Sequence, residues 1–150
     1  MSRSLYESDF YGWVQHQVAL LREGAWDAVD IENIIEEIES TRRGERQQLV
    51  HRLTVLMVHL LKWCFQSERR GRSWRLSVEE QRLRLERHMV MNPSLKPQLA
   101  EVVREAYSFA VIRSRKETGM DKHVFPRLGP WSFDQMMKED FWPELEGHEE

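Results

Sequence analysis

The fold can be predicted from residues 31–65, whose sequence is IENIIEEIESTRRGERQQLVHRLTVLMVHLLKWCF. Apolar residues recur along it at the 3.6-residue spacing of an α-helix, and the phase holds across Gly44, which predicts one long helix. Residues 31–48 are apolar on one side only. Residues 49–65 are apolar almost all round, so neighbouring helices must enclose them. We therefore expect residues 49–65 to form the centre of the fold. The apolar positions on this spacing are Ile31, Ile34, Ile35, Ile38, Leu49, Leu53, Leu56, Leu60 and Trp63.

Three shorter helices are predicted around the long one, because their apolar residues also repeat with a helical period. Ser8 or Asp9 can cap the first helix and Asp30 can cap the long one, since a short side-chain oxygen accepts from an orphan amide of the first turn. The third helix begins at Ser73 or at Ser77, which matches a capping box. The four helices cover about residues 8–23, 31–65, 73–92 and 94–118.

The composition changes after Gly119, which is a natural end for the fourth helix. Aromatic residues alternate there with prolines and glycines, and a short helix is predicted to start at Ser132. We expect residues 120–146 to form an aromatic strap laid across a core formed by residues 8–118. The aromatic residues are Phe125, Trp131, Phe133, Phe141 and Trp142. The predicted fold is therefore all-α, a bundle of about four main helices in a single domain, residues 1–150.

Composition and charge narrow the classes of function. The 150 residues fit one ordinary domain, and 41% hydrophobic residues with 7 Gly and 5 Pro exclude a disordered chain. The net charge of -3 predicts no general attraction to nucleic acid or to anionic membranes. Acids concentrate in residues 27–45 and arginines in residues 68–88. Such segments either face each other or face water.

Metal and cofactor sites find little support in the sequence. Cys64 is the one cysteine, which excludes an intramolecular disulfide and a cysteine-based zinc site. None of the six histidines has a glutamate three residues before it, the spacing that di-iron helical bundles need. We expect Cys64 to be a buried core residue, and we expect no metal and no cofactor.

A cytoplasmic location is the expectation from the hydropathy pattern. The first four residues lack the apolar core of a signal peptide. The most hydrophobic stretch, residues 55–65, is interrupted by His59 and Lys62 and is too short to cross a bilayer.

Several short motifs, in order along nearly the whole chain, resemble a known bacterial family, domain-of-unknown-function family twenty-nine. The motifs are Asp9-Phe10-Tyr11-Gly12-Trp13, Gln17, Leu20-Leu21-Arg22, Asp30-Ile31-Glu32-Asn33-Ile34-Ile35-Glu36-Glu37-Ile38-Glu39-Ser40, His59-Leu60-Leu61-Lys62-Trp63, Arg72-Ser73-Trp74, Pro93-Ser94-Leu95, Phe125-Pro126 and Asp140-Phe141-Trp142-Pro143. Gln66-Ser67-Glu68 departs from it, since a proline is expected after the glutamine. The resemblance implies an all-helical bacterial protein and implies no activity.

His59 and Arg52 are the candidate catalytic residues. His59 interrupts the most apolar part of the long helix, where a buried imidazole must find a hydrogen-bond partner such as a carboxylate, for example that of Asp9. With Arg52 it also fits the arginine–histidine spacing of HEPN-type ribonucleases, in which the two residues serve acid–base and phosphate-binding roles. Two other arginine–histidine pairs in this chain fit the same spacing, so the pattern has little specificity.

Two further groups of residues could form sites. Arg69, Arg70 and Arg72 lie near Trp74, and arginines mixed with aromatic residues are typical of single-strand nucleic-acid binders. The alternative is an arginine stacked on a tryptophan to close a loop. Glu36 and Glu37 could supply a general base or could form a solvated helix face. Together with Asp9 and His59 they form a candidate polar cluster.

The sequence favours a non-enzymatic protein-interaction or regulatory module, because packing signals are abundant and no convergent catalytic set is found. Its partner would be another protein or a second copy, bound through helix faces or through the strap. Nucleic acid and membranes are not expected partners. The alternative is a HEPN-like ribonuclease or nucleic-acid binder that uses Arg52, His59 and the arginines of residues 69–75.

Overall fold

The computed structural model describes residues 4–66, 68 and 70–143, and these residues contain helices and no strand. The all-α fold predicted from the sequence is therefore confirmed. The α-helices are α1 (Leu5–Ser8), α2 (Phe10–Glu23), α3 (Ile31–Phe65), α4 (Arg72–Met91), α5 (Leu99–Thr118) and α6 (Phe133–Met136). Three short 3₁₀ helices connect them: η1 (Trp26–Ala28), η3 (Pro93–Gln98) and η4 (Lys122–Val124).

The long helix has the bounds that its apolar spacing predicts, residues 31–65. The contacts within the chain divide it into two compact units, residues 1–44 and residues 45–150. The division falls within α3, just after Gly44. The single-domain organisation stays a prediction.

The starts of three helices differ from the predicted ones. Ser8 lies in α1, so Asp9 alone caps α2, its carboxylate accepting from the amide of Gly12 at 3.0 Å. The capping box at Ser77 is wrong, because α4 already begins at Arg72 and Ser77 lies inside it. Residues 93–98 are a 3₁₀ helix rather than the first turns of α5. Pro97 lacks the amide hydrogen that an α-helix would use there.

The first unit is held by hydrogen bonds around Asp30, just before α3. The indole nitrogen of Trp13 donates to the Asp30 carboxylate at 3.1 Å, and the Asp30 amide donates to the side-chain oxygen of Gln17 at 2.7 Å. These bonds fix α2 against the start of α3. The hydroxyl of Tyr6 also donates to the carboxylate of Glu37, and the rings of Tyr6 and Trp13 meet edge to face.

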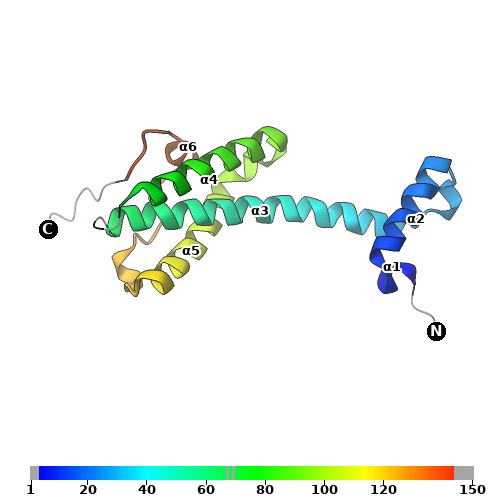
Figure 1. Cartoon of the computed structure of the whole chain (residues 1–150), viewed down its shortest axis with the longest axis horizontal. Helices are drawn as coiled ribbons and strands as arrows, with labels where there is room; N and C mark the ends of the chain where they lie inside the picture. The colour runs from blue at the N-terminus through cyan, green and yellow to red at the C-terminus, as the bar shows by residue number, and fades with distance from the viewer. Residues whose placement is uncertain (1–3, 67, 69, 144–150) are drawn as a thin grey trace. The chain divides into compact units, whose positions relative to one another are not determined.

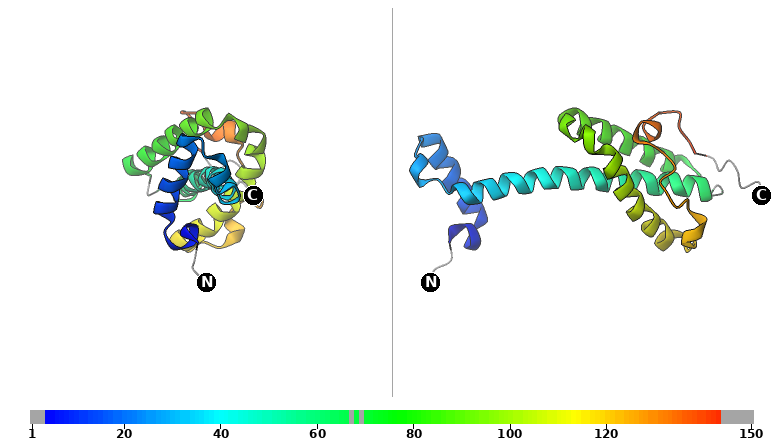
Figure 2. Two further views of the ribbon diagram at one scale, coloured as in Figure 1. Left: turned by 90° about the vertical axis from the view of Figure 1, so that its right-hand side faces the viewer. Right: turned by 180° about the vertical axis from the view of Figure 1, so that it is seen from behind.

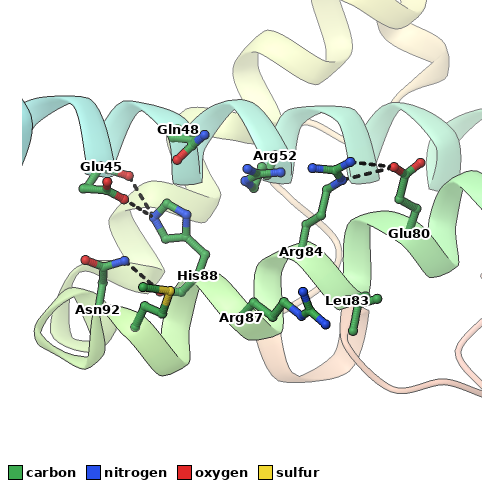
Figure 3. Close-up of a pocket in the computed structure, with 10 residues that line it drawn as sticks. Glu45, Gln48, Arg52, Glu80, Leu83, Arg84, Arg87, His88 and Asn92 are labelled. Atoms are coloured by element: carbon green, nitrogen blue, oxygen red, sulfur yellow. Dashed lines mark hydrogen bonds and ion pairs between the residues drawn. The ribbon is translucent and has the colours of Figure 1, made fainter.

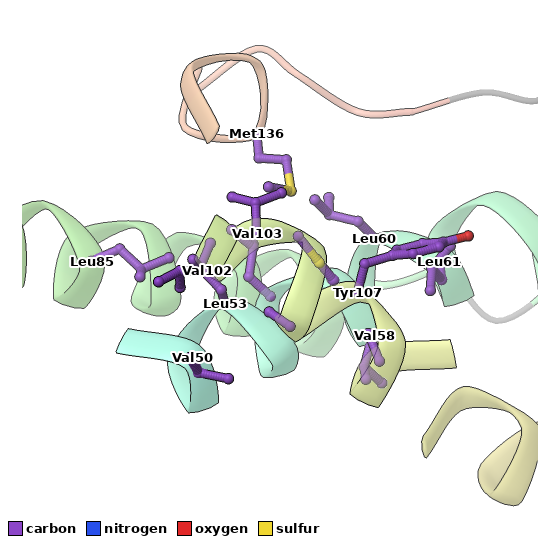
Figure 4. Close-up of a cluster of buried hydrophobic side chains, with 14 of the residues drawn as sticks. Val50, Leu53, Val58, Leu60, Leu61, Leu85, Val102, Val103, Tyr107 and Met136 are labelled. Carbon is purple, nitrogen blue, oxygen red and sulfur yellow. The ribbon is translucent and has the colours of Figure 1, made fainter. Parts of the chain in front are cut away.

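The second unit encloses the later turns of α3. In Figure 1, and from behind in Figure 2, α4 and α5 lie along these turns. Figure 4 shows the resulting core, with Leu85 from α4, Val102 from α5 and Met136 from α6 directed at α3. Residues of α3 with no exposed surface are Leu49, Leu53, Leu56, Leu60 and Leu61. This confirms the prediction that neighbouring helices enclose residues 49–65.

Aromatic residues after η4 contact the core of the second unit. Phe125 is buried against the ring of Phe65, and Trp142 packs on Trp63 with ring centres 4.4 Å apart. Arg82 of α4 fixes this segment. Its guanidinium is buried and donates to the carbonyls of Met136, Glu139 and Phe141 at 2.8, 3.3 and 2.6 Å. Residues 144–146 of the predicted strap lie outside the described residues.

Candidate functional site

A stripe of isoleucines on α3 is an exposed apolar feature of the first unit. Ile31, Ile35 and Ile38 are 56%, 50% and 65% exposed. Their spacing of four and then three residues places them on one face of the helix. We call these three residues the isoleucine stripe. Further exposed apolar residues of the first unit are Leu5, Phe10, Tyr11, Val14, Val18, Leu21 and Trp26.

The stripe is uncovered because the buried side chains of α2 contact Asp30 instead. Among the described residues of the first unit, Trp13 and Gln17 alone are buried, and both serve the hydrogen bonds to Asp30. A unit of this size cannot bury a large core by itself. The first unit therefore keeps most of its apolar side chains in contact with solvent.

The charges beside the stripe are unevenly distributed along α3. Glu32 and Glu36 follow its first turns, and two arginines follow Ile38. Arg43 pairs with Glu36 at 3.0 Å. Arg42 lies on the same face as the stripe, four residues after Ile38, and has no ion pair with another described residue. The stripe thus starts beside Asp30 and Glu32, has Glu36, Glu37 and Glu39 along it, and is followed by Arg42, which has no ion pair with another described residue.

The second unit contains a polar pocket of about 550 Å³ between α3 and α4. Figure 3 shows Arg84 and His88 directed from α4 toward α3, whose Glu45, Gln48 and Arg52 line the other side. The remaining lining residues are Glu80, Leu83, Arg87, Met91 and Asn92. We call this the α3–α4 pocket.

Some charges of the α3–α4 pocket are paired within the chain. The buried ring of His88 places Nε2 3.0 Å from the carbonyl of Glu45 and 3.5 Å from its carboxylate. Arg84 donates twice to Glu80, at 3.1 and 2.9 Å. The contact of His88 with Glu45 links α4 to α3, whereas Arg84 and Glu80 neutralise each other within α4.

The other two arginines of the pocket have no such partner. Neither Arg52 nor Arg87 forms an ion pair or a side-chain hydrogen bond with another described residue. Nε of Arg52 is enclosed and unpaired. The pocket therefore holds two guanidinium groups without a carboxylate partner among the described residues, and its arginines outnumber its glutamates by one.

The two candidate catalytic residues, Arg52 and His59, have different surroundings. Arg52 lines the α3–α4 pocket, and His59 is not among the residues that line it. Nδ1 of His59 lies 2.9 Å from the carbonyl of Val55 in the preceding turn, so this backbone atom is its hydrogen-bond partner, rather than the carboxylate of Asp9. The hydrogen bond between Glu117 and Lys62 lowers the pKa of the Glu117 carboxyl. The nearby His59 contributes a smaller effect in the same direction.

The arginines near Trp74 divide among different contacts. Arg70 donates to the carbonyl of Trp63 at 2.7 Å and lies 5.0 Å from the centre of its ring. Trp74 is covered by the ammonium of Lys62 at 5.9 Å, and Arg72 begins α4. Arg69 lies outside the described residues. Arg70 therefore makes the kind of arginine–tryptophan contact that closes a loop.

The predicted polar cluster of Asp9, Glu36, Glu37 and His59 is distributed over both units. Asp9 is used as the cap of α2, Glu37 accepts from Tyr6, and Glu36 pairs with Arg43. His59 belongs to the second unit. Each of the four side chains thus has a local partner of its own.

Sequence reasoning missed most of the α3–α4 pocket. Glu80, Arg84 and Arg87 are spaced by four and three residues, which places them on one helix face. That spacing could have indicated a charged face on α4. No local signal shows that His88 meets Glu45, because these residues are 43 positions apart.

Two kinds of site are absent from residues 4–66, 68 and 70–143. No group of three or more histidine, cysteine, aspartate or glutamate side chains there is placed to hold a metal ion. None of the helices in that part of the chain combines the length and the apolar character needed to span a membrane.

A protein-family model matches nearly the whole chain. The family model described as "Domain of unknown function DUF29" matches residues 5–142. The chain therefore belongs to this family, as the motifs of the sequence predicted. Searches of curated proteins and of solved structures found no match.

Proposed function

We propose that this DUF29 protein is a non-enzymatic interaction module, and that its first unit binds a second copy of the chain through the isoleucine stripe. The exposure of that stripe is the observation that carries the proposal. Large contiguous apolar surfaces on a soluble protein mark sites of association. Spacings of four and three residues are those of helices that pack along a shared seam.

The size of the first unit supports a second copy as the occupant. A domain of about 60 residues is only marginally stable, and below about 40 residues a domain usually needs disulfides, metals or oligomerisation. The first unit has 44 residues and leaves the isoleucine stripe open. Pairing two stripes would give each copy the core that it lacks.

The charges beside the stripe favour an antiparallel arrangement of the two copies. In that arrangement, Arg42 of one copy lies beside the start of α3 in the other copy. Glu32 and Asp30 are at that position, so the unpaired guanidinium would meet carboxylates. A parallel arrangement would place arginine against arginine, which is unfavourable.

Sedimentation equilibrium of the full chain tests the proposal. We expect a reversible dimer for the wild type and a monomer for Ile35→Glu, because the substitution places a charge in the seam. Leu76→Glu is the matched control, since Leu76 of α4 is also 50% exposed and belongs to the second unit. Circular dichroism checks that each variant keeps its helices. A wild type that stays monomeric at the highest concentration reached overturns the proposal, and so does an equal effect of the two variants.

A charge exchange tests the antiparallel arrangement. Arg42→Glu should weaken the dimer about two- to fivefold, the range expected for a pair at the edge of an interface. Adding Glu32→Arg to the same chain should restore the affinity, because the two charges exchange places. Failure of the double variant to recover would contradict the antiparallel pairing while leaving the stripe itself in place.

A further inference from the structure

The unpaired arginines of the α3–α4 pocket indicate a ligand site that is independent of the isoleucine stripe. The pocket belongs wholly to the second unit. It has three arginines and two glutamates, and Arg84 neutralises Glu80 while His88 contacts Glu45. Arg52 and Arg87 have no carboxylate partner among the described residues, and the three arginines exceed the two glutamates by one charge. A protein with a net charge of -3 thus contains a local positive site.

We propose that the α3–α4 pocket binds a small molecule that carries a phosphate monoester. A phosphate monoester is close to a dianion at neutral pH, and the two guanidinium groups without a carboxylate partner can each bind it. Arginine is also the side chain best suited to phosphate, because its planar fork donates two parallel hydrogen bonds. Arg52 and Arg87 come from facing helices, α3 and α4, and can approach the phosphate from two sides.

The uncharged residues of the pocket indicate the rest of the ligand. The side-chain amide of Gln48 has no hydrogen-bond partner among the described residues and can bind a polar substituent. Leu83 and Met91, which are 51% and 81% exposed, give the pocket an apolar edge. The volume of about 550 Å³ lies in the range of small-molecule sites. We therefore expect the phosphate to be attached to a ring or hydrocarbon group.

Calorimetric titration of the full chain at fixed ionic strength tests this site. The probes are inorganic phosphate, pyrophosphate and adenosine monophosphate, with sulfate as the control for charge alone. We expect adenosine monophosphate to bind more tightly than inorganic phosphate, because it adds contacts at the apolar edge. Absence of binding by all three phosphate compounds overturns the proposal. Sulfate binding as tight as phosphate binding overturns it as well.

Matched variants locate the binding in the pocket. Arg87→Gln removes an exposed guanidinium, and we expect it to weaken binding of adenosine monophosphate about tenfold. Arg104→Gln, which removes an exposed arginine of α5 outside the pocket, should leave binding unchanged. Glu80→Gln should strengthen binding, because it frees Arg84 from its carboxylate. Equal losses for Arg87→Gln and Arg104→Gln would show a non-specific charge effect and would overturn the site.

Arg52→Gln gives a second test from the facing helix. We expect a loss of about tenfold or more, since Arg52 is less exposed than Arg87 and less screened by solvent. Because its side chain is partly enclosed, circular dichroism and thermal unfolding must show that the variant is folded. Arg87→Gln alone keeps the proposal falsifiable if Arg52→Gln unfolds.

Discussion

The early and late turns of α3 share one helical backbone and differ in what covers their apolar residues. In the first unit, Ile35 and Ile38 are 50% and 65% exposed, whereas in the second unit Leu53 and Leu60 have no exposed surface. Helical periodicity is a local property, so both segments meet it equally well. Coverage depends on other elements, and α4 and α5 supply it within the second unit. Apolar spacing thus predicts a helix in both units, whereas the depth of the core depends on the neighbouring elements.

Truncating one apolar residue in each unit should show the largest difference. Leu60→Ala removes a fully buried side chain and should lower the free energy of unfolding by about 2–5 kcal/mol, because it leaves a cavity. Ile38→Ala should change it by less than about 0.5 kcal/mol in dilute solution, where the chain is monomeric. Urea unfolding followed by circular dichroism measures both. Similar losses for the two variants would contradict the contrast between covered and uncovered turns.

A second comparison sets Arg82, a buried charge of the second unit, against an exposed arginine of the same helix. Arg82→Met should destabilise the chain by about 3 kcal/mol, since the carbonyls of Met136, Glu139 and Phe141 lose their common donor. Arg87→Met on the same helix is exposed and should cost less than about 0.5 kcal/mol. Thermal unfolding of the two variants gives the test. An Arg82→Met chain as stable as the wild type would show that these bonds do not fix the C-terminal segment.

Alanine substitutions at two glycines should change the stability of the chain in opposite directions. Gly119 ends α5 with a φ of 73°, a left-handed conformation in which a side chain is strained, so Gly119→Ala should lower stability by about 1 kcal/mol. Gly44 lies within α3 with open space around it, so Gly44→Ala should raise stability by about 0.5–1 kcal/mol. The midpoints of denaturant unfolding, measured for both variants, test these two expectations. A loss of stability for Gly44→Ala would indicate that α3 is not a regular helix where the two units meet.

Two tyrosines, one in each unit, have similar pKa values for different reasons. The hydrogen bond to Glu37 raises the pKa of Tyr6 from 10.0 to about 12, and burial raises the pKa of Tyr107 to about 12. Both pKa values lie above the ordinary one, so each tyrosine favours the folded chain up to about pH 10. That contribution is lost as the pH rises through about 12.

Glu37→Ala separates the two causes. It should lower the pKa of Tyr6 toward 10 and leave the pKa of Tyr107 near 12. Ultraviolet difference titration assigns the signals by comparison with Tyr6→Phe and Tyr107→Phe. An unchanged titration of Tyr6 in Glu37→Ala would contradict the hydrogen bond that links α1 to α3.

The sequence predicted well whatever depends on local pattern. The bounds of α3, the end of α5 at Gly119 and the start of α6 after Ser132 all follow from spacing or from capping chemistry. The start of α4 at Arg72 lies one residue before Ser73, the earlier of its two predicted starts, whereas the start at Ser77 is wrong. The start of α5 was missed, because Pro97 favours a 3₁₀ helix.

The site was less predictable, because its residues are distant in the sequence. Arg52 was selected as a catalytic partner of His59, and the structure places it beside Arg84 and His88 of α4 instead. The pairing of His88 with Glu45 depends on how α3 packs against α4, which residue spacing does not encode. The apolar repeat that contains the isoleucine stripe was visible, but its exposure was not. An apolar helix face has the same sequence pattern whether or not something covers it.

Amide hydrogen exchange along α3, measured at low and high protein concentration, tests the central contrast most directly. We predict slow exchange for residues 49–61 at both concentrations, because other helices of the same chain enclose them. Residues 31–44 should exchange quickly in dilute solution and slowly in concentrated solution, where a second copy covers the stripe. Fast exchange in residues 49–61, or protection of residues 31–44 that does not change with concentration, would contradict this account.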